Sequence, residues 1–248
     1  MHELTSRIRR LIGKHSIQRG RLTNVVVNRN AEKFEVNNWA ISEFVLSCLV
    51  PIVGIRPYPL NELMLMVASI ARLEPSHVFE WGTHVGKSAR IFHETANALG
   101  LECEIHSVEL PPGSNHIEHP RSQVGKYVRG IDEVILHRGD GLDVSLGIAK
   151  SLPSDVRLLF FLDGDHEFES VLRELSGILA ARPDAIILVH DTFDQSADAG
   201  YNLGPDRAVE RILEESRFML YKMTVNTGLP GLTLLYRPAI SAALARDA

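Results

Sequence analysis

Two apolar runs in this sequence end abruptly in acidic and imidazole side chains. The first run is followed by Asp163, Asp165 and His166, and the second ends in His190 and Asp191. Buried parallel strands are typically continuous apolar runs, and polar residues follow where the strand leaves the sheet. In an open α/β sheet the ligand lies beyond these carboxyl ends, so we expect these side chains to converge on one crevice. Carboxylates and histidines placed there can hold a hard cation, transfer a proton, or do both.

A glycine-containing loop follows an earlier apolar run, within Phe79–Ser88. Gly82 and Gly86 allow the backbone to turn tightly and to approach a ligand closely, and the helix start that follows offers unpaired amide groups to a negative charge. The Gly-x-x-x-Gly spacing matches neither the dinucleotide fingerprint nor a P-loop, although Lys87-Ser88 mimics the end of the latter. A tight turn without a ligand explains the glycine pair equally well.

Two acidic residues follow the next apolar runs. Glu109 can accept hydrogen bonds from the two hydroxyls of a ribose, or it is a surface carboxylate. Asp140, in the segment His137–Gly141, can face an adenine amino group, or it belongs to an Asp-Gly turn. The combination of these pieces in this order is more specific than any single piece.

The elements that must position these residues alternate between strand and helix. We expect strands at His77–Trp81, Glu104–Leu110, Val134–His137, Leu158–Asp163, Ile186–Asp191, Phe218–Val225 and Leu232–Tyr236. We expect helices at Gly86–Leu99, Asp143–Leu152, Glu167–Ala181 and Asp206–Ser216, with Gly100 ending the first of them. This alternation predicts a doubly wound α/β fold with a mostly parallel seven-stranded sheet. The connection between the last two strands is too short for a parallel crossover, so they form an antiparallel hairpin.

The N-terminal part of the chain carries no chemical motif. Residues 1–30 are basic, which indicates either an arm that touches a partner or a solvated helix. Residues 38–73 have helical spacing and cover one end of the sheet, and Pro51, Pro57 and Pro59 are expected to break the segment. We therefore divide the chain into a helical extension or lid, residues 1–59, and a catalytic domain, residues 60–248.

Composition narrows the class of protein. The 248 residues are 45% hydrophobic and 23% charged, which suits a globular protein with a large core. The net charge of −5 argues against a nucleic-acid binder. Two cysteines form no disulfide framework, and the apolar stretch Phe44–Ile55 is too short to span a membrane. We expect a cytoplasmic protein, with the apolar helices before residue 75 as a homo-oligomer interface, a lid or a cap.

The motifs together resemble the class I S-adenosylmethionine-dependent methyltransferases. The resembling motifs are, in order, Glu-x-Gly-x-x-x-Gly-x-Ser, the acid Glu109, Gly-Asp-Gly, Leu-Asp-Gly-Asp-His and His-Asp-Thr-Phe. The resemblance as a whole covers about residues 60–237. It is most similar to the branch of macrolide-sugar O-methyltransferases and cephalosporin-hydroxylase-like proteins. The resemblance implies a Rossmann-like methyltransferase fold with S-adenosylmethionine as cofactor.

The resemblance also implies roles for individual residues. The first loop would hold the methionine part of the cofactor, Glu109 the ribose, and the Gly-Asp-Gly segment the adenine. The implied cofactor-binding set is Glu80, Gly82, Thr83, Gly86, Ser88, Glu109, Asp140, Gly141 and Asp163. His166 would be the general base, in a catalytic set with Asp163 and Asp191. The implied metal ligands are Asp163, His190 and Asp191.

A bound Mg²⁺ or Mn²⁺ would acidify vicinal hydroxyls and orient one of them toward the methyl group. Metal-dependent relatives have two acids, or an acid and an amide, where this chain has His190-Asp191. Histidine suits magnesium poorly, so His190 is not a ligand, or another metal is used, or none binds. Without a metal, Asp163 and Asp191 would cap the following helices, and His166 would be a satisfied polar residue at a helix start. Trp81 and Phe168 are expected to pack in the core, and His116 and His119 to lie in a solvated loop.

We therefore predict an O-methyltransferase acting on a small molecule, a sugar or another polyhydroxylated natural product. The alternatives are a nicotinamide-dependent oxidoreductase on a similar sheet, and a protein that binds S-adenosylmethionine without turnover. A nitrogen or carboxylate acceptor also stays open.

Overall fold

A seven-stranded sheet forms the centre of the computed structural model, which describes residues 21–26, 28–29, 31, 33–113, 123–196, 201–217 and 219–237. The strand order is β3-β2-β1-β4-β5-β7-β6, in which β7 runs antiparallel between β5 and β6 and the other pairs are parallel. The strands are β1 His77–Trp81, β2 Glu104–Glu109, β3 Val134–Arg138, β4 Leu158–Leu162, β5 Ile186–His190, β6 Tyr221–Val225 and β7 Leu232–Tyr236. This confirms the predicted fold and its terminal hairpin. Phe218, the predicted start of β6, lies outside the described residues.

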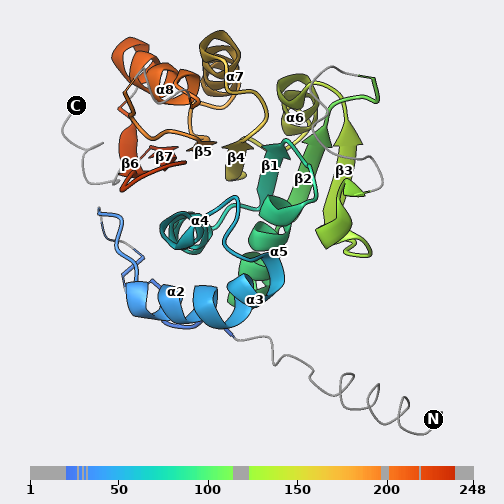
Figure 1. Ribbon diagram of the computed structural model, residues 1–248, viewed down its shortest axis with the longest axis vertical. Helices are drawn as coiled ribbons and strands as arrows, with labels where there is room; N and C mark the ends of the chain where they lie inside the picture. The colour runs from blue at the N-terminus through green and yellow to red at the C-terminus, as the bar shows by residue number, and fades with distance from the viewer. Residues whose placement is uncertain are drawn as a thin grey trace, which may run out of the picture.

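Helices cover both faces of the sheet, and a separate hydrophobic core lies on each face (Figure 1). One face carries α4 Leu60–Leu73 and α5 Lys87–Leu99, and the other carries α6 Gly141–Ala149, α7 Phe168–Ala181 and α8 Gly204–Glu215. Every residue of β4 and β5 is buried, because both faces of these strands are packed against helices. The apolar runs seen in the sequence are therefore the central strands.

The helix ends follow local chemistry. Gly100 ends α5 in a left-handed conformation, as predicted. The helix predicted from Asp143 begins earlier, at Gly141, because Asp140 accepts a hydrogen bond from the Asp143 amide and so acts as the N-cap. A short 3-10 turn, η3 Lys126–Val128, follows the segment 114–122, which lies outside the described residues and contains His116 and His119.

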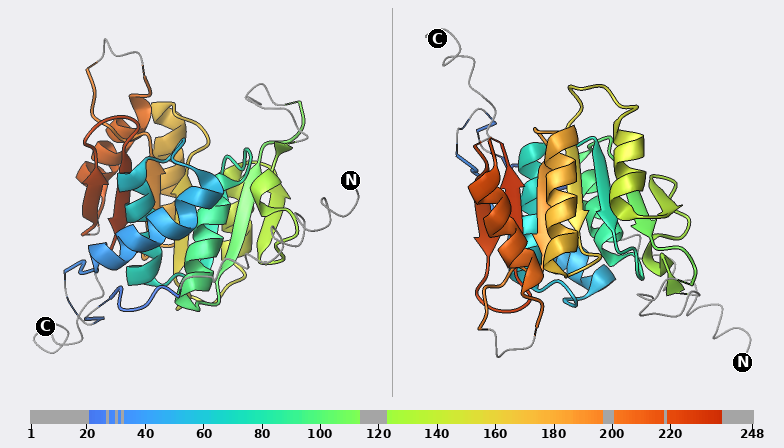
Figure 2. Two further views of the ribbon diagram at one scale, coloured as in Figure 1. Left: turned by 60° about the horizontal axis from the view of Figure 1, so that its bottom comes forward. Right: turned by 90° about the horizontal axis from the view of Figure 1, so that it is seen from above.

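The N-terminal helical segment packs onto α4 and α5. It is continuous over α2 Asn38–Phe44, η1 Val45–Leu49 and α3 Val50–Val53, and Figure 2 (left) shows it lying across the two longer helices. The expected break at Pro51 is wrong: the wider π-helical turn of η1 precedes the proline, and the chain leaves the helix only at Gly54. Residues 1–20 of the predicted basic arm lie outside the described residues.

Residues 21–59 share one core with the rest of the chain. Ile41, Phe44 and Leu49 are buried in the same cluster as Ile91 of α5 and Phe161 of β4. Within the described part of the chain, no helix combines the length and apolar character needed to cross a bilayer. The parallel strands β1 to β5 all present their carboxyl ends at one edge of the sheet, and the candidate site lies there.

Candidate active site

The glycine loop after β1 is shaped by the end of β4. Gly82 has φ of +91°, and a Cβ atom added to it would lie 2.2 Å from the carbonyl oxygen of Asp163. Only glycine fits this close approach of two strand ends. Gly86, with φ of +83°, ends the turn by donating its amide to the Thr83 carbonyl, and α5 begins directly after it. The Gly-x-x-x-Gly spacing seen in the sequence therefore has a steric cause.

A chain of hydroxyls connects the loop to a buried carboxylate. Ser107 of β2 donates to Glu80 Oε1 at 2.6 Å, and its oxygen lies 2.7 Å from Thr83 Oγ1. Burial raises the pKa of Glu80 to about 7, although Ser107 and Ser88 hydrogen bonds lower it. The second carboxylate oxygen, Oε2, is buried without a well-formed hydrogen bond. A buried carboxylate with a free oxygen suits the ammonium group of a methionine moiety.

Glu109 and Asp140 follow β2 and β3. One oxygen of Glu109 accepts the His84 amide at 2.8 Å and holds the loop, which leaves the other for a ribose hydroxyl. Both oxygens of Asp140 have partners in this chain, the Asp143 amide and Arg173 at 2.8 Å. The cap role of Asp140 is thus established by geometry, and its contact with adenine stays a prediction.

Gly141 and Gly164 enclose the indole ring of Trp81. A Cβ atom at Gly141 would lie 2.4 Å from the ring, and one at Gly164 would lie 2.9 Å from it. Trp81 is 4% exposed and belongs to the core, as predicted, while its edge also lines the cavity described below.

The polar residues that follow β4 and β5 lie close together, as expected from the sequence. His166 Nε2 lies 2.8 Å from Asp191 Oδ2 and 3.8 Å from Asp163 Oδ1. Nε2 is buried, and its short distance to Asp191 identifies an ion pair that holds the ring in place. Burial opposes the charge, but the two carboxylates outweigh it and raise the pKa of His166 to about 10.

Neither aspartate caps a helix. Asp163 accepts Tyr58 Oη at 2.6 Å, and Asp191 accepts Tyr201 Oη at 2.9 Å and Asn202 Nδ2 at 2.8 Å. Helices α7 and α8 begin without a side-chain cap, so the capping alternative is wrong for both residues. Asp165 is the residue that serves the start of α7, because it accepts the Glu167 amide and the Ser170 hydroxyl.

Each ring nitrogen of His190 faces a carboxylate. Nδ1 lies 2.9 Å from Asp163 Oδ1, and Nε2 lies 3.1 Å from Oε2 of Glu62, a fully buried residue of α4. Glu62 also accepts the amide of Gly231 at 2.8 Å. Burial opposes the charge on His190, but Asp163, Glu62 and Asp191 raise its pKa well above the usual value. His190 is therefore a buried cation between two acids.

This donor set fits a divalent metal poorly. Ligand atoms of Asp163, His190 and Asp191 lie within 4.8 Å of one another, which is compact enough for an ion. However, a protonated imidazole has no lone pair to give, and both aspartates are already occupied by donors of this chain. The positive charge that a metal would supply is present as His190 and His166. The metal role of these residues stays a prediction.

A cavity of about 690 Å³ joins all these features. Its wall includes the glycine loop, Glu109, Asp140, Asp163, His166 and Asp191. Because the carboxyl ends follow the strand order, Glu109 and Asp140 lie toward β3 and the acid–histidine group lies toward β5. A second cavity of about 720 Å³ adjoins the first and shares Pro57, His84, Lys87 and Tyr201 with it.

A comparison with protein families matches the stretch of chain that supplies most residues of this cavity. The model of a family described as "Methyltransferase domain" matches residues 79–192, from β1 to the residue after Asp191. This stretch of the chain is similar to that family. The whole chain has the class I methyltransferase fold, as the sequence resemblance predicted.

Several solved structures of O-methyltransferases share the fold of this chain. A putative O-methyltransferase from Klebsiella pneumoniae has a TM-score of 0.54 and 21% identity, over 80% of this chain and 90% of its own. An O-methyltransferase from Bacillus cereus in complex with SAH has a TM-score of 0.51 and 18% identity, over 79% and 90%. The O-methyltransferase TomG from Streptomyces achromogenes, in complex with SAM, has a TM-score of 0.50 and 18% identity, over 82% and 89%. A comparison with curated protein sequences gave no match.

Four residues of the candidate active site were missed by sequence reasoning: Tyr58, Glu62, Tyr201 and Asn202. Tyr58 and Glu62 come from the helical segment, which was treated as a cover. A signal for Glu62 existed, because it is an acid on the same helical face as Met66 and Ser69, all three fully buried. Tyr201 and Asn202 lie in a loop without any pattern.

Proposed function

We propose that this methyltransferase transfers a methyl group from S-adenosylmethionine to a hydroxyl oxygen of a small molecule, a sugar or another polyhydroxylated compound. One observation carries the proposal. A single cavity is lined at one end by Glu109 and the glycine loop and at the other by Asp163, His166 and Asp191. The first group suits a nucleoside with a methionine moiety, and the second suits proton removal.

When bound, the cofactor supplies a methyl group made electrophilic by a positive sulfur. His166 would take the proton of the acceptor hydroxyl as the methyl group passes from the sulfur to the hydroxyl oxygen. Asp191 orients the imidazole and balances the charge that His166 gains, as the carboxylate does in an acid–histidine pair. Tyr58 and His190 hold the Asp163 side chain in place at the wall of the cavity.

Calorimetry on the purified full chain tests the cofactor assignment. We expect micromolar binding of S-adenosylmethionine and S-adenosylhomocysteine, and no binding of NAD. Glu109→Ala removes the ribose acceptor and should weaken binding about tenfold or more. The control Glu133→Ala, an exposed acid before β3, should leave binding unchanged. Binding of NAD alone would favour the oxidoreductase alternative and reject the proposal.

Turnover separates an enzyme from a protein that only binds the cofactor. His166→Ala should lower kcat by about 10²- to 10⁴-fold while leaving S-adenosylmethionine affinity within twofold of the wild type. Because the donor set does not favour a metal at Asp163, we expect EDTA to leave kcat unchanged. Loss of activity in EDTA that Mg²⁺ or Mn²⁺ restores would return these residues to the role of metal ligands.

The adjoining cavity supports an acceptor that carries negative charge. Among the described residues, its wall contains Arg56, Lys87 and Lys126 and no acid. Both lysines lie over the ring of Tyr127. A panel of sugar phosphates and the matching free sugars tests this: the phosphates should have the higher kcat/KM, and Lys126→Gln should raise their KM with little change in kcat. A preference for the free sugars would contradict it.

A homo-oligomer, a cytoplasmic location and the absence of nucleic-acid or membrane partners remain predictions from the sequence.

A further inference from the structure

A row of histidines begins at the sheet edge opposite to the candidate active site and crosses β1, β2 and β3 obliquely. His77 and Glu104 are the first residues of β1 and β2, and the strand register pairs them directly. His106 lies two residues along β2, so it shares a face with Glu104. His137 of β3 continues the row. None of these side chains takes part in the proposed methyl transfer.

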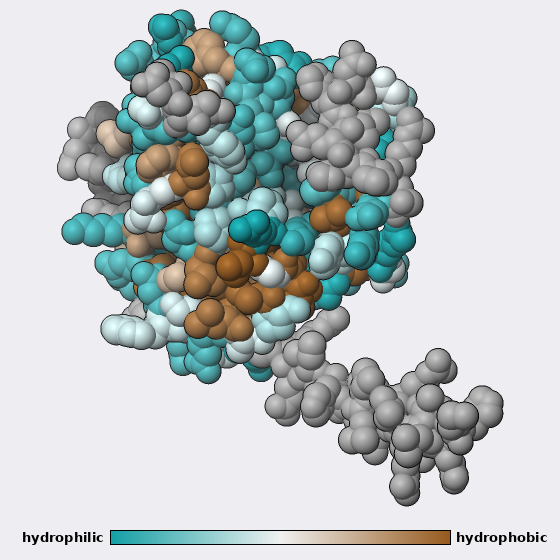
Figure 3. All heavy atoms as spheres, in the orientation of Figure 1, coloured by the Kyte–Doolittle hydropathy of each residue, from teal (hydrophilic) through white to brown (hydrophobic). Residues whose placement is uncertain are grey.

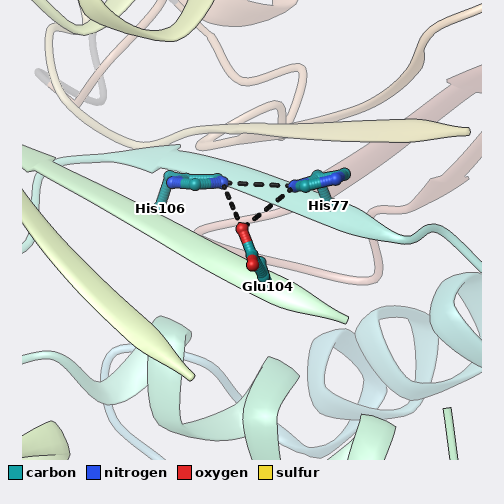
Figure 4. Close-up of side chains that lie close together, drawn as sticks. All are labelled: His77, Glu104 and His106. Carbon is teal, nitrogen blue, oxygen red and sulfur yellow. Dashed lines mark hydrogen bonds and ion pairs between the residues drawn. The ribbon is translucent and has the colours of Figure 1, made fainter. Parts of the chain in front are cut away.

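The three nearest ligand atoms form a compact triangle (Figure 4). His77 Nδ1 lies 3.2 Å from His106 Nε2, and Glu104 Oε2 lies 3.7 Å from the first nitrogen and 3.6 Å from the second. In a tetrahedral zinc site with bonds of about 2.0–2.1 Å, ligand atoms are about 3.3 Å apart. The point equidistant from the three atoms of this triangle lies about 2.0 Å from each, which is the length of a zinc–nitrogen or zinc–oxygen bond.

The histidines of this row are neutral and carry lone pairs. Burial, with His137 and His77 as neighbours, lowers the pKa of His106 to about 4. Burial also lowers the pKa of His77, despite the nearby Glu104 carboxylate. Neutral imidazole is the form that binds a metal, whereas the histidines of the active site are held as cations. The two clusters are therefore chemically opposite.

His137 completes the arrangement behind His106. Its Nε2 lies 3.2 Å from His106 Nδ1 and can accept that N–H, which leaves His106 Nε2 unprotonated toward the triangle. A hydrogen bond on the far nitrogen is the usual way in which a protein fixes a ligating histidine. His106 is buried, while the Glu104 side chain is 58% exposed, so one side of the triangle opens to solvent.

We propose that His77, Glu104 and His106 bind a divalent transition-metal ion of the zinc class, with solvent in the remaining coordination position. Two imidazoles and one carboxylate suit zinc, cobalt or nickel better than magnesium. The ligands come from two adjacent strands, so the bound ion ties β1 to β2 where both strands begin. The competing explanation is a row of N–H···N hydrogen bonds between neutral histidines, without an ion.

Zinc titration of the EDTA-treated, dialysed full chain tests the proposal. Calorimetry should detect one zinc equivalent per chain, and the melting temperature should rise until that equivalent is bound. Replacing zinc by Co²⁺ should give visible absorption of tetrahedral cobalt. Glu104→Gln, on an exposed side chain, should weaken zinc binding at least tenfold, and His137→Phe should weaken it about tenfold by releasing His106.

Two controls make the result specific to this cluster. Glu102→Gln, an exposed acid just before β2, makes the same charge change and should leave zinc affinity unchanged. Asp191→Asn, in the candidate active site, should also leave it unchanged. Absence of binding at micromolar zinc, or binding that survives both Glu104→Gln and His77→Gln, would overturn the proposal. Zinc binding lost in Asp191→Asn but kept in Glu104→Gln would also overturn it.

Discussion

The same side chain takes opposite charge states at the two edges of this sheet. His190 lies between Glu62 and Asp163, so its pKa rises, whereas His106 lies between two histidines, so its pKa falls. Burial lowers the pKa in both cases, and the neighbours decide the outcome. The charge of the neighbouring groups thus decides whether a buried histidine keeps its proton or stays neutral and able to bind a metal.

The raised pKa of His166, the proposed general base, predicts how kcat/KM depends on pH. With a pKa of about 10, His166 is protonated at pH 7 and cannot accept a proton. Because only the neutral form is active, kcat/KM should rise about tenfold per pH unit from pH 7 toward 10 and then level off. Initial rates across that range measure it.

Asp191→Asn removes a carboxylate that holds the proton on His166. The rise in rate should then shift to lower pH, and the plateau should fall because the ring loses its orientation. A rate that falls between pH 7 and 9 in the wild type would contradict the assignment of His166 as the base.

Glycine positions give a paired prediction at the level of strand and helix. Gly82→Ala places a Cβ atom against the Asp163 backbone at positive φ, so it should lower the free energy of unfolding by about 2 kcal/mol or more. Gly147→Ala, within α6 and open to solvent, should raise it by about 0.5–1 kcal/mol. Urea unfolding measures both. Equal effects of the two substitutions would mean that the β1–β4 approach is not fixed in solution.

Helix α4 is tied to the sheet by one buried acid. Glu62 holds His190 at the end of β5 and the Gly231 amide before β7. Glu62→Ala leaves His190 with an uncompensated charge, so it should lower the free energy of unfolding by about 3–5 kcal/mol. Glu214→Ala, on the exposed side of α8, should change it by less than about 0.5 kcal/mol. A loss below about 1 kcal/mol in Glu62→Ala would show that the acid does not pair with His190.

These elements also show what the sequence could predict. Strands β4 and β5 and the convergence of His166 with Asp191 were predictable, because buried parallel strands are long apolar runs whose carboxyl ends share an edge. The pairing of Glu62 with His190 was not, because the two residues are 128 positions apart and no local pattern connects them. The histidine row likewise depends on strand register, which the sequence does not specify residue by residue.

In the whole molecule, the two edges of one sheet carry groups of side chains with opposite charge states. Its carboxyl edge gathers acids around protonated histidines, and its opposite edge gathers neutral histidines around one acid. Most side chains of each set come from adjacent parallel strands, so strand order and register bring them together. The metal proposal and the methyl-transfer proposal can therefore succeed or fail separately.

The N-terminal helices leave an apolar surface that supports the predicted homo-oligomer. Trp39 is 88% exposed, and Leu46 and Ile55 are more than half exposed. Figure 3 shows hydrophobic surface gathered where Figure 1 draws α2 and α3. A contiguous apolar patch of this kind typically marks an interface, and we expect a second copy of this chain to cover it.

Light scattering after size exclusion tests this surface directly. The wild type should run as a dimer, and Trp39→Glu should run as a monomer, because burying an unpaired charge in an apolar interface is costly. Met219→Glu is the matched control, since Met219 is 73% exposed and lies just before β6, away from α2. It should remain a dimer. A monomeric wild type, or a Trp39→Glu variant that stays dimeric, would show that the exposed helices serve another purpose than self-association.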